Sequence, residues 1–143
     1  MRVARVMAGL IATALAGTGC ALDGATSSCD PVGIAGTWVY TGQQTAPELR
    51  DLSGTARIDS TTAVLGGTFE LQEFANGVLV GTRTGVITGC QTSSAVELQF
   101  SGAAFARRHL GTQRGDTISG EWFSQDAATT ARGAFRLRRG ALR

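Results

Sequence analysis

The stretch Val96-Glu97-Leu98-Gln99-Phe100 alternates apolar and polar side chains without interruption. Because successive side chains of a strand point to opposite faces of a sheet, this period of two predicts a β-strand with one buried face. Similar stretches lie on both sides of it, separated by turn signals such as Asn76-Gly77 and Arg114-Gly115-Asp116. The sequence therefore predicts eight strands, over residues 37–41, 55–59, 68–74, 78–88, 96–100, 105–113, 117–123 and 131–138.

The spacing of these strands predicts how they are connected. The apolar residues Leu98, Leu110 and Trp122 are twelve residues apart, and even spacing with short turns is typical of a meander in which each strand pairs with the next. Such a ribbon hides its apolar face by closing into a barrel or by folding over as a sandwich. Glycines in or beside the strands favour a sharply coiled sheet and hence the barrel. We predict an all-β fold, an eight-stranded antiparallel up-and-down barrel, with a β-sandwich as the alternative.

The sandwich alternative rests on the order of Cys29, Trp38 and Cys90, which resembles that of immunoglobulin domains. Two features oppose it. Thr88 stands where those domains have a tyrosine, two residues before the second cysteine. In addition, four predicted strands follow Cys90, where an immunoglobulin domain would be ending.

Length and charge limit the class of protein. The chain has 143 residues, which fits one domain, and all 13 of its basic residues are arginine. Without Arg2 and Arg5, which lie in a predicted leader, eleven arginines balance eleven acidic residues. A neutral mature chain argues against a nucleic-acid partner held by bulk charge. A transmembrane barrel is not expected either, because charges such as Arg57, Glu70 and Glu97 occupy the face that lipid would cover.

Residues 1–19 have the three parts of a secretory signal peptide. Arg2 and Arg5 supply the positive start, residues 6–16 form an apolar stretch too short to span a bilayer, and small residues precede Cys20. This ending resembles the signal of bacterial lipoproteins, in which the cysteine becomes the lipidated N-terminus, although Gly17 stands where an aliphatic residue is usual. Ordinary cleavage after Ala16 is the alternative and would give a soluble secreted or periplasmic protein.

The lipoprotein resemblance implies that Cys20 is acylated, with palmitate or a similar chain, and anchors the protein in a cell-envelope membrane. Ala21, rather than aspartate, follows the cysteine and implies the outer membrane, with the protein facing the periplasm or the cell surface. Residues 20–30 are then the lipidated N-terminus and a flexible tether, and residues 31–143 form the barrel domain.

The cysteine count supports lipidation. Three cysteines leave one unpaired in an oxidising compartment, whereas modification of Cys20 leaves the even pair Cys29 and Cys90. We predict a disulfide between Cys29 and Cys90. Its loop of roughly 60 residues is worth about 4 kcal/mol in the chain-entropy model.

The tripeptide Gly36-Thr37-Trp38, at the start of the first predicted strand, resembles the G-x-W signature of the calycins, the group of lipocalins, fatty-acid-binding proteins and avidins. The resemblance covers these three residues and the strand count. It implies a small barrel in which an arginine of the last strand, Arg136 or Arg138, lies over Trp38. Avidins have an asparagine two residues after this tryptophan, whereas this chain has Tyr40, which argues against biotin binding.

An interior of eight strands is either filled by side chains or wide enough for one small ligand, and the sequence leaves both open. The candidate residues for a small apolar ligand are Trp38, Tyr40, Phe69, Leu98, Trp122 and Phe135. The full predicted lining also includes Ile58, Leu71, Phe100, Ile118 and Leu137. Without a ligand, the protein is expected to be a structural or protein-interaction module of the envelope, docking through outward apolar residues such as Val39, Phe74 and Phe123.

The sequence offers little for catalysis. His109 is the only imidazole, no nucleophile is paired with it, and we expect it to be a surface or packing residue. The chain lacks metal-ligand spacing and a phosphate-binding glycine loop, so no enzyme activity, metal or cofactor is expected. Arg107-Arg108 and residues 136–139 form either an anion or lipid-headgroup patch or a solvated outer face, which four glutamates would balance: Glu70, Glu73, Glu97 and Glu121.

Overall fold

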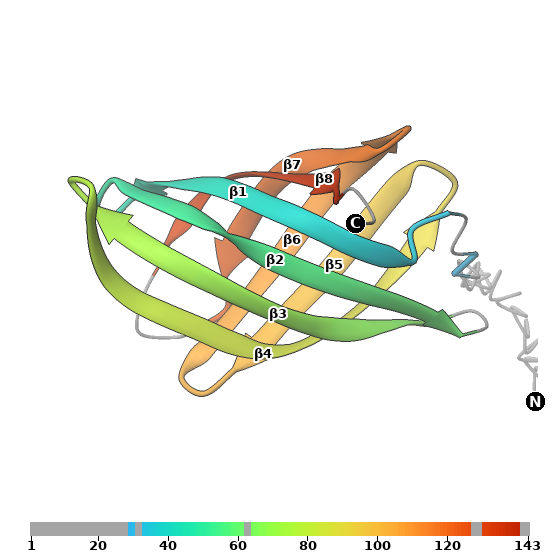
Figure 1. Cartoon of the computed structure of the whole chain (residues 1–143), viewed down its shortest axis with the longest axis horizontal. Coiled ribbons are helices and arrows are strands. Elements are labelled where there is room, and N and C mark those ends of the chain that lie inside the picture. The colour runs from blue at the N-terminus through green and yellow to red at the C-terminus, as the bar shows by residue number, and fades with distance from the viewer. Residues whose placement is uncertain (1–28, 31–32, 62–63, 127–129, 141–143) are drawn as a thin grey trace, which may run out of the picture.

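Eight strands follow one another around a closed antiparallel barrel (Figure 1). The computed structural model describes residues 29–30, 33–61, 64–126 and 130–140, and within these ranges no helix is long and apolar enough to cross a membrane. The strands are β1 Gly36–Ala46, β2 Arg50–Thr61, β3 Val64–Ala75, β4 Val78–Thr92, β5 Ala95–Gly102, β6 Phe105–Arg114, β7 Thr117–Ser124 and β8 Arg132–Arg139. Each strand pairs with the next, and β8 pairs with β1. The predicted all-β up-and-down barrel is confirmed, and the sandwich alternative is wrong.

Several strands run further than the alternation predicted. β1 continues beyond Thr41 to Ala46, and β4 continues beyond Thr88 to Thr92. These extensions are mostly polar or glycine-containing, so they show no apolar period. They stay extended because neighbouring strands pair with them: Gln44 of β1 lies opposite both Arg50 of β2 and Gly133 of β8, and Gln91 of β4 lies opposite Val96 of β5.

Glycine allows paired strands to approach closely at two places. A β-carbon added to Gly133 would overlap the carbonyl oxygen of Gln43 on β1, and one added to Gly120 of β7 would overlap that of Leu110 on β6. Both obstacles are backbone atoms of the neighbouring strand, which do not move aside as a flexible side chain would. This agrees with the predicted role of glycine in a sharply coiled sheet.

The inner face of the barrel is an apolar core. All eleven predicted lining residues are buried. The ring centres of Phe69 on β3 and Phe100 on β5 are 4.8 Å apart, and Tyr40 of β1 stacks on Phe135 of β8 at 6.2 Å. The ring centres of Tyr40 on β1 and Phe100 on β5 are 5.9 Å apart, so rings from opposite sides of the barrel meet and side chains occupy its middle.

The two ends of the barrel differ. The β1–β2, β3–β4, β5–β6 and β7–β8 connections share one end, which we call the mouth, at the left of Figure 1. The opposite end, which we call the base, receives the chain before β1 and carries the β4–β5 and β6–β7 turns. The described chain before β1 therefore joins the barrel at the base.

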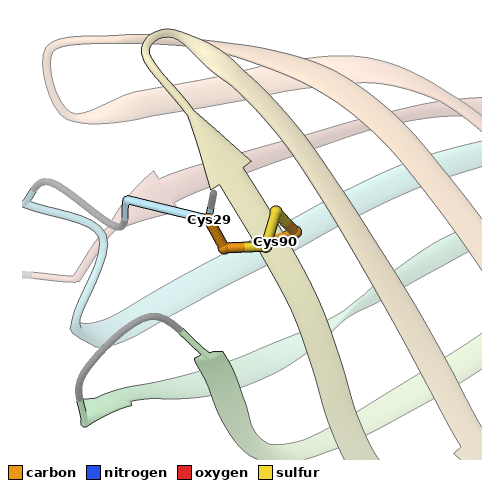
Figure 2. Close-up of a disulfide and its surroundings, with 2 residues drawn as sticks. All are labelled: Cys29 and Cys90. Atoms are coloured by element: carbon orange, nitrogen blue, oxygen red, sulfur yellow. A yellow bond between two sulfur atoms is a disulfide. The ribbon is translucent and has the colours of Figure 1, made fainter. Parts of the chain in front are cut away.

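A disulfide pins the chain to the base. Cys29 and Cys90 of β4 are bonded, with their Cα atoms 5.1 Å apart, as Figure 2 shows. Next to this bond the backbone N–H of Asp30 donates to the carbonyl oxygen of Gln91 at 2.7 Å. The predicted cysteine pair is confirmed. The predicted signal peptide and the predicted lipid attachment at Cys20 lie outside the described residues.

Trp38 lies at the base between two neighbours. Its indole N–H donates to the carbonyl oxygen of Ile34 at 2.8 Å, and the guanidinium of Arg139 lies 4.5 Å from its ring centre. The prediction that Arg136 or Arg138 covers this ring is wrong. Both of those residues alternate with buried residues of β8 and lie exposed on its outer face, whereas Arg139 falls on the inward parity.

Candidate functional site at the barrel mouth

The mouth of the barrel contains a cavity of about 550 Å³. Connections β1–β2, β5–β6 and β7–β8 and the adjoining strand ends form its walls, which combine charged with apolar side chains. The lining residues are Gln44, Pro47, Arg50, Glu73, Arg83, Ala104, Phe105, Arg107, Ser124, Asp126 and Ala131. This volume lies within the usual range for a small-molecule site.

Glu73 is the centre of an ion-pair cluster in this cavity. Its side chain is 2% exposed, and its Oε1 lies 2.8 Å from Nη2 of Arg107. Its Oε2 lies 3.4 Å from Nη1 of Arg50 and 3.8 Å from Nη2 of Arg83. One buried carboxylate thus faces three guanidinium groups, from β2, β4 and β6.

Arg107 is the most enclosed of the three arginines. Its guanidinium carbon lies 4.1 Å from the ring centre of Trp122 and 4.5 Å from that of Phe105, so the group packs against two aromatic rings. Burial lowers the pKa of this guanidinium, while the Glu73 carboxylate raises it. The rings and the ion pair together hold the side chain in one place.

Several donors at the mouth lack an acceptor. Among the described residues, Nη1 of Arg107, Nε of Arg50, Nε of Arg83 and Nε1 of Trp122 are buried nitrogens without a hydrogen-bond partner. A buried donor without an acceptor is costly, and one explanation for such a group in a native fold is a partner that binds there. The three arginines of the cavity lining are thus incompletely hydrogen-bonded within the part of the chain that the structure describes.

His109 lies in the core, below the mouth. Its Nε2 is 3.1 Å from the Tyr40 hydroxyl, and its ring centre is 4.3 Å from that of Phe100 and 4.9 Å from that of Phe135. Burial, and secondly the charge of Arg107, lower the pKa of His109 to about 3, while burial raises the pKa of Tyr40 above its usual value. His109 was expected to be either a surface residue or a packing residue, and the structure shows that it packs in the core.

The six candidate ligand residues are all buried on the inner face, and none of them lines the mouth cavity. Tyr40, Phe69 and Phe135 belong to the packed ring cluster of the core. Trp38 and Trp122 lie toward opposite ends of the barrel. Their partners on β8, Arg139 and Gly133, are six residues apart. Trp38 therefore belongs to the base and Trp122 to the mouth.

The ion-pair cluster of Glu73, Arg50, Arg83 and Arg107, the mouth cluster, was not predicted from the sequence. An outer-face position was one of the two predictions for Arg107 and the position expected for Glu73, but the structure places both inside the barrel, where they are 7% and 2% exposed. The alternation of the strands does indicate an inward position for both residues. Glu73 lies an even number of residues from Phe69 and Leu71, and Arg107 lies two residues from Phe105, so they share the faces of those buried residues. By contrast Arg108, paired with Glu97 at 2.7 Å, does lie on the outer face.

The outward apolar residues that were predicted as a docking surface are only partly exposed to solvent. Val39 is 48% exposed and Phe123 is 38% exposed, whereas Phe74 is half-buried. A larger exposed group lies at the start of β4, next to the mouth: Val78, Leu79 and Val80 are 65%, 50% and 50% exposed.

Comparison with known proteins supports the fold alone. No family model and no curated protein matches the chain. Among solved structures, it resembles one described as a de novo design of a fluorescence-activating beta barrel, with a TM-score of 0.55, 16% sequence identity, and coverage of 74% of this chain and 93% of that chain. The likeness agrees with the eight-stranded barrel, and the disulfide is compatible with an exported protein.

Proposed function

We propose that the protein is a lipid-anchored cell-envelope β-barrel that binds a small molecule at its mouth. The observation that carries this proposal is the mouth cavity of about 550 Å³, in which three guanidinium groups adjoin apolar side chains. Small-molecule sites are usually concave and mainly apolar, with a few fixed polar groups. The core itself is occupied by packed rings, so the mouth is the better place for a ligand than the space between Trp38 and Trp122.

The anchoring part of the proposal is supported by the signal-like leader, the cysteine count and the bond between Cys29 and Cys90. The predicted lipid on Cys20 precedes Cys29, which is fixed to the base. The mouth would then point away from the membrane, where a solute reaches it freely. The arginine over Trp38 is consistent with the calycin resemblance, although Arg139 supplies it.

We propose binding rather than catalysis as the role of the site. His109, the only imidazole, is enclosed by aromatic rings and hydrogen-bonded to Tyr40. The mouth contains arginines and carboxylates held in ion pairs, an arrangement suited to recognition through charge and hydrogen bonds.

Intact mass of the protein extracted from its own membranes tests the anchoring. We expect a chain that starts at Cys20, carries acyl groups, and gains two hydrogens on reduction of the Cys29–Cys90 bond. A chain that starts at Gly17 without acyl groups would contradict the anchor and would favour the soluble alternative.

Native mass spectrometry of the same preparation tests the ligand. We expect a small-molecule adduct that is released on unfolding. Ala104→Trp places a bulky ring in the cavity and is expected to lower the adduct fraction, whereas Ala103→Trp, on the same turn but outside the cavity lining, is the matched control. A bare mass, together with no binding across a panel of small neutral and anionic aromatic dyes, would overturn ligand binding.

The second candidate function is an envelope interaction module with a filled barrel and no ligand. It is favoured by the exposed apolar group Val78, Leu79 and Val80 beside the mouth. Replacing Leu79 and Val80 with serine would then remove a specific crosslink to an envelope protein in cells, while Ala104→Trp would leave that crosslink unchanged. A crosslinking pattern that these serine substitutions do not alter would count against this role.

A further inference from the structure

We infer that the mouth cavity selects ligands that carry an anionic group, of which an organic carboxylate is the simplest. This inference rests on the proposed small-molecule function of the same cavity. Its lining holds three guanidinium groups, those of Arg50, Arg83 and Arg107, and two carboxylates, those of Glu73 and Asp126. One positive charge is left over, and a single anionic group would balance it.

The neighbouring acid Glu48 does not remove this surplus. Glu48 lies 3.3 Å from Nη2 of Arg50, but its side chain is 71% exposed and does not line the cavity. Water screens a charge in that position, whereas charges inside the cavity are screened less. The Arg50 charge is thus only partly offset from outside.

Hydrogen bonding points to the same ligand chemistry. Glu73 already uses Oε1 on Arg107 and Oε2 on Arg50 and Arg83. Each of these arginines also has one nitrogen without an acceptor among the residues that the structure describes, but that nitrogen is enclosed by protein, so the part of each guanidinium group that lines the cavity is what would contact a ligand. A carboxylate offers two oxygens that accept only, and its hydrogen bonds to guanidinium groups are charge-assisted and stronger than those of a neutral amide.

Arg107 is prepared for this role by its surroundings. Its side chain is 8% exposed and packs against Trp122 and Phe105, so little conformational freedom remains to be lost on binding. Phe105 also lines the cavity, together with Pro47 and Ala131. A ligand with its carboxylate toward Arg107 would have these three side chains for its apolar part.

Three probes of nearly the same shape separate charge from size: benzoate, benzamide and benzamidine. Their affinities are measured by ligand-observed NMR titration of the full-length protein in nanodiscs of zwitterionic lipid, with empty nanodiscs as the blank. We expect benzamide to bind at least tenfold more weakly than benzoate and benzamidine to bind more weakly still. Equal affinities, or tighter binding of benzamidine, would overturn the anionic preference and leave a small-molecule site. No binding of any probe would overturn both.

Arginine variants test whether the preference arises at the mouth. Arg107→Gln is expected to abolish the difference between benzoate and benzamide, but it leaves Glu73 buried with less compensation and can affect folding. Arg83→Gln is the safer variant, because Arg83 is 38% exposed, and a several-fold loss of benzoate affinity with unchanged benzamide affinity is expected. Arg108→Gln removes the same charge from the outer face and is the matched control. Equal losses in Arg83→Gln and Arg108→Gln would contradict a local site.

Discussion

Nη2 of Arg107 lies 2.8 Å from Oε1 of Glu73, and both side chains are more than nine-tenths buried inside the mouth of the barrel. The two residues belong to β6 and β3, which are not paired, so their contact crosses the barrel rather than following its sheet. This ion pair therefore affects both the stability of the mouth and the charge of the proposed site.

Removal of one member of this pair should be strongly destabilising. Glu73→Ala leaves the Arg107 guanidinium buried without its carboxylate, and we expect unfolding in urea to show a loss of about 3–5 kcal/mol. Glu97→Ala, which breaks the exposed pair with Arg108, is the control and should change stability far less. The double variant Glu73→Leu/Arg107→Met, which removes both charges, should recover much of the loss. Equal, small effects of Glu73→Ala and Glu97→Ala would contradict the buried ion pair.

Stability should decrease toward acidic pH because of His109. In the unfolded chain the imidazole binds a proton near pH 6.5, whereas in the fold its pKa is lowered to about 3. Between these values the unfolded state binds more protons, so the contribution is complete above pH 6.5 and is lost, at about 1.4 kcal/mol per pH unit, as the pH falls toward 3.

The variant His109→Gln isolates this contribution from that of the carboxylates. Glutamine keeps a polar group beside the Tyr40 hydroxyl but does not titrate. Urea unfolding at several pH values between 3 and 7 should give a shallower decline for the variant than for the natural chain. Parallel declines would mean that His109 is protonated in the folded protein and is less enclosed than the structure indicates.

The disulfide should stabilise the barrel without affecting the mouth. Cys29 and Cys90 are 61 residues apart in sequence, and loss of a bond closing such a loop costs about 4 kcal/mol in the chain-entropy model. We expect the double variant Cys29→Ser/Cys90→Ser to lower the free energy of unfolding by about 2–5 kcal/mol. Because the bond lies at the base, benzoate affinity of the folded variant should stay unchanged. A change in benzoate affinity without a change in the free energy of unfolding would contradict this prediction.

The fold was predictable because the information is local. Val96 to Phe100 alternates apolar with polar side chains, and the same rule located all eleven predicted core positions, from Trp38 to Leu137. Neighbouring strands with short turns pair with each other almost by necessity. Strand ends were less predictable, since the extension of β1 to Ala46 is polar and depends on hydrogen bonds to both neighbours.

The mouth cluster was not predicted, for two physical reasons. Charged residues are rarely buried, so an outer-face position was considered for Glu73 and Arg107, although both alternate in step with the inward-facing residues of their strands. Their contact also crosses between strands that are not adjacent, and the sequence contains no local signal for it. The arginine over Trp38 was also not predictable from local pattern alone. The alternation of β8 excludes Arg136 and Arg138 from the inner face, whereas the contact of Arg139 with Trp38 depends on how the chain closes the base.

The position of a bound probe tests the central claim most directly. Backbone amide NMR of the full-length protein in nanodiscs, titrated with benzoate, should show perturbed signals at Arg50, Phe105 and Ala131 around the mouth and unchanged signals at Ile34 and Trp38 at the base. Ala104→Trp should remove these perturbations, and Ala103→Trp should not. Perturbations centred on Trp38 and Tyr40, or perturbations that persist in Ala104→Trp, would place the ligand elsewhere and contradict the account.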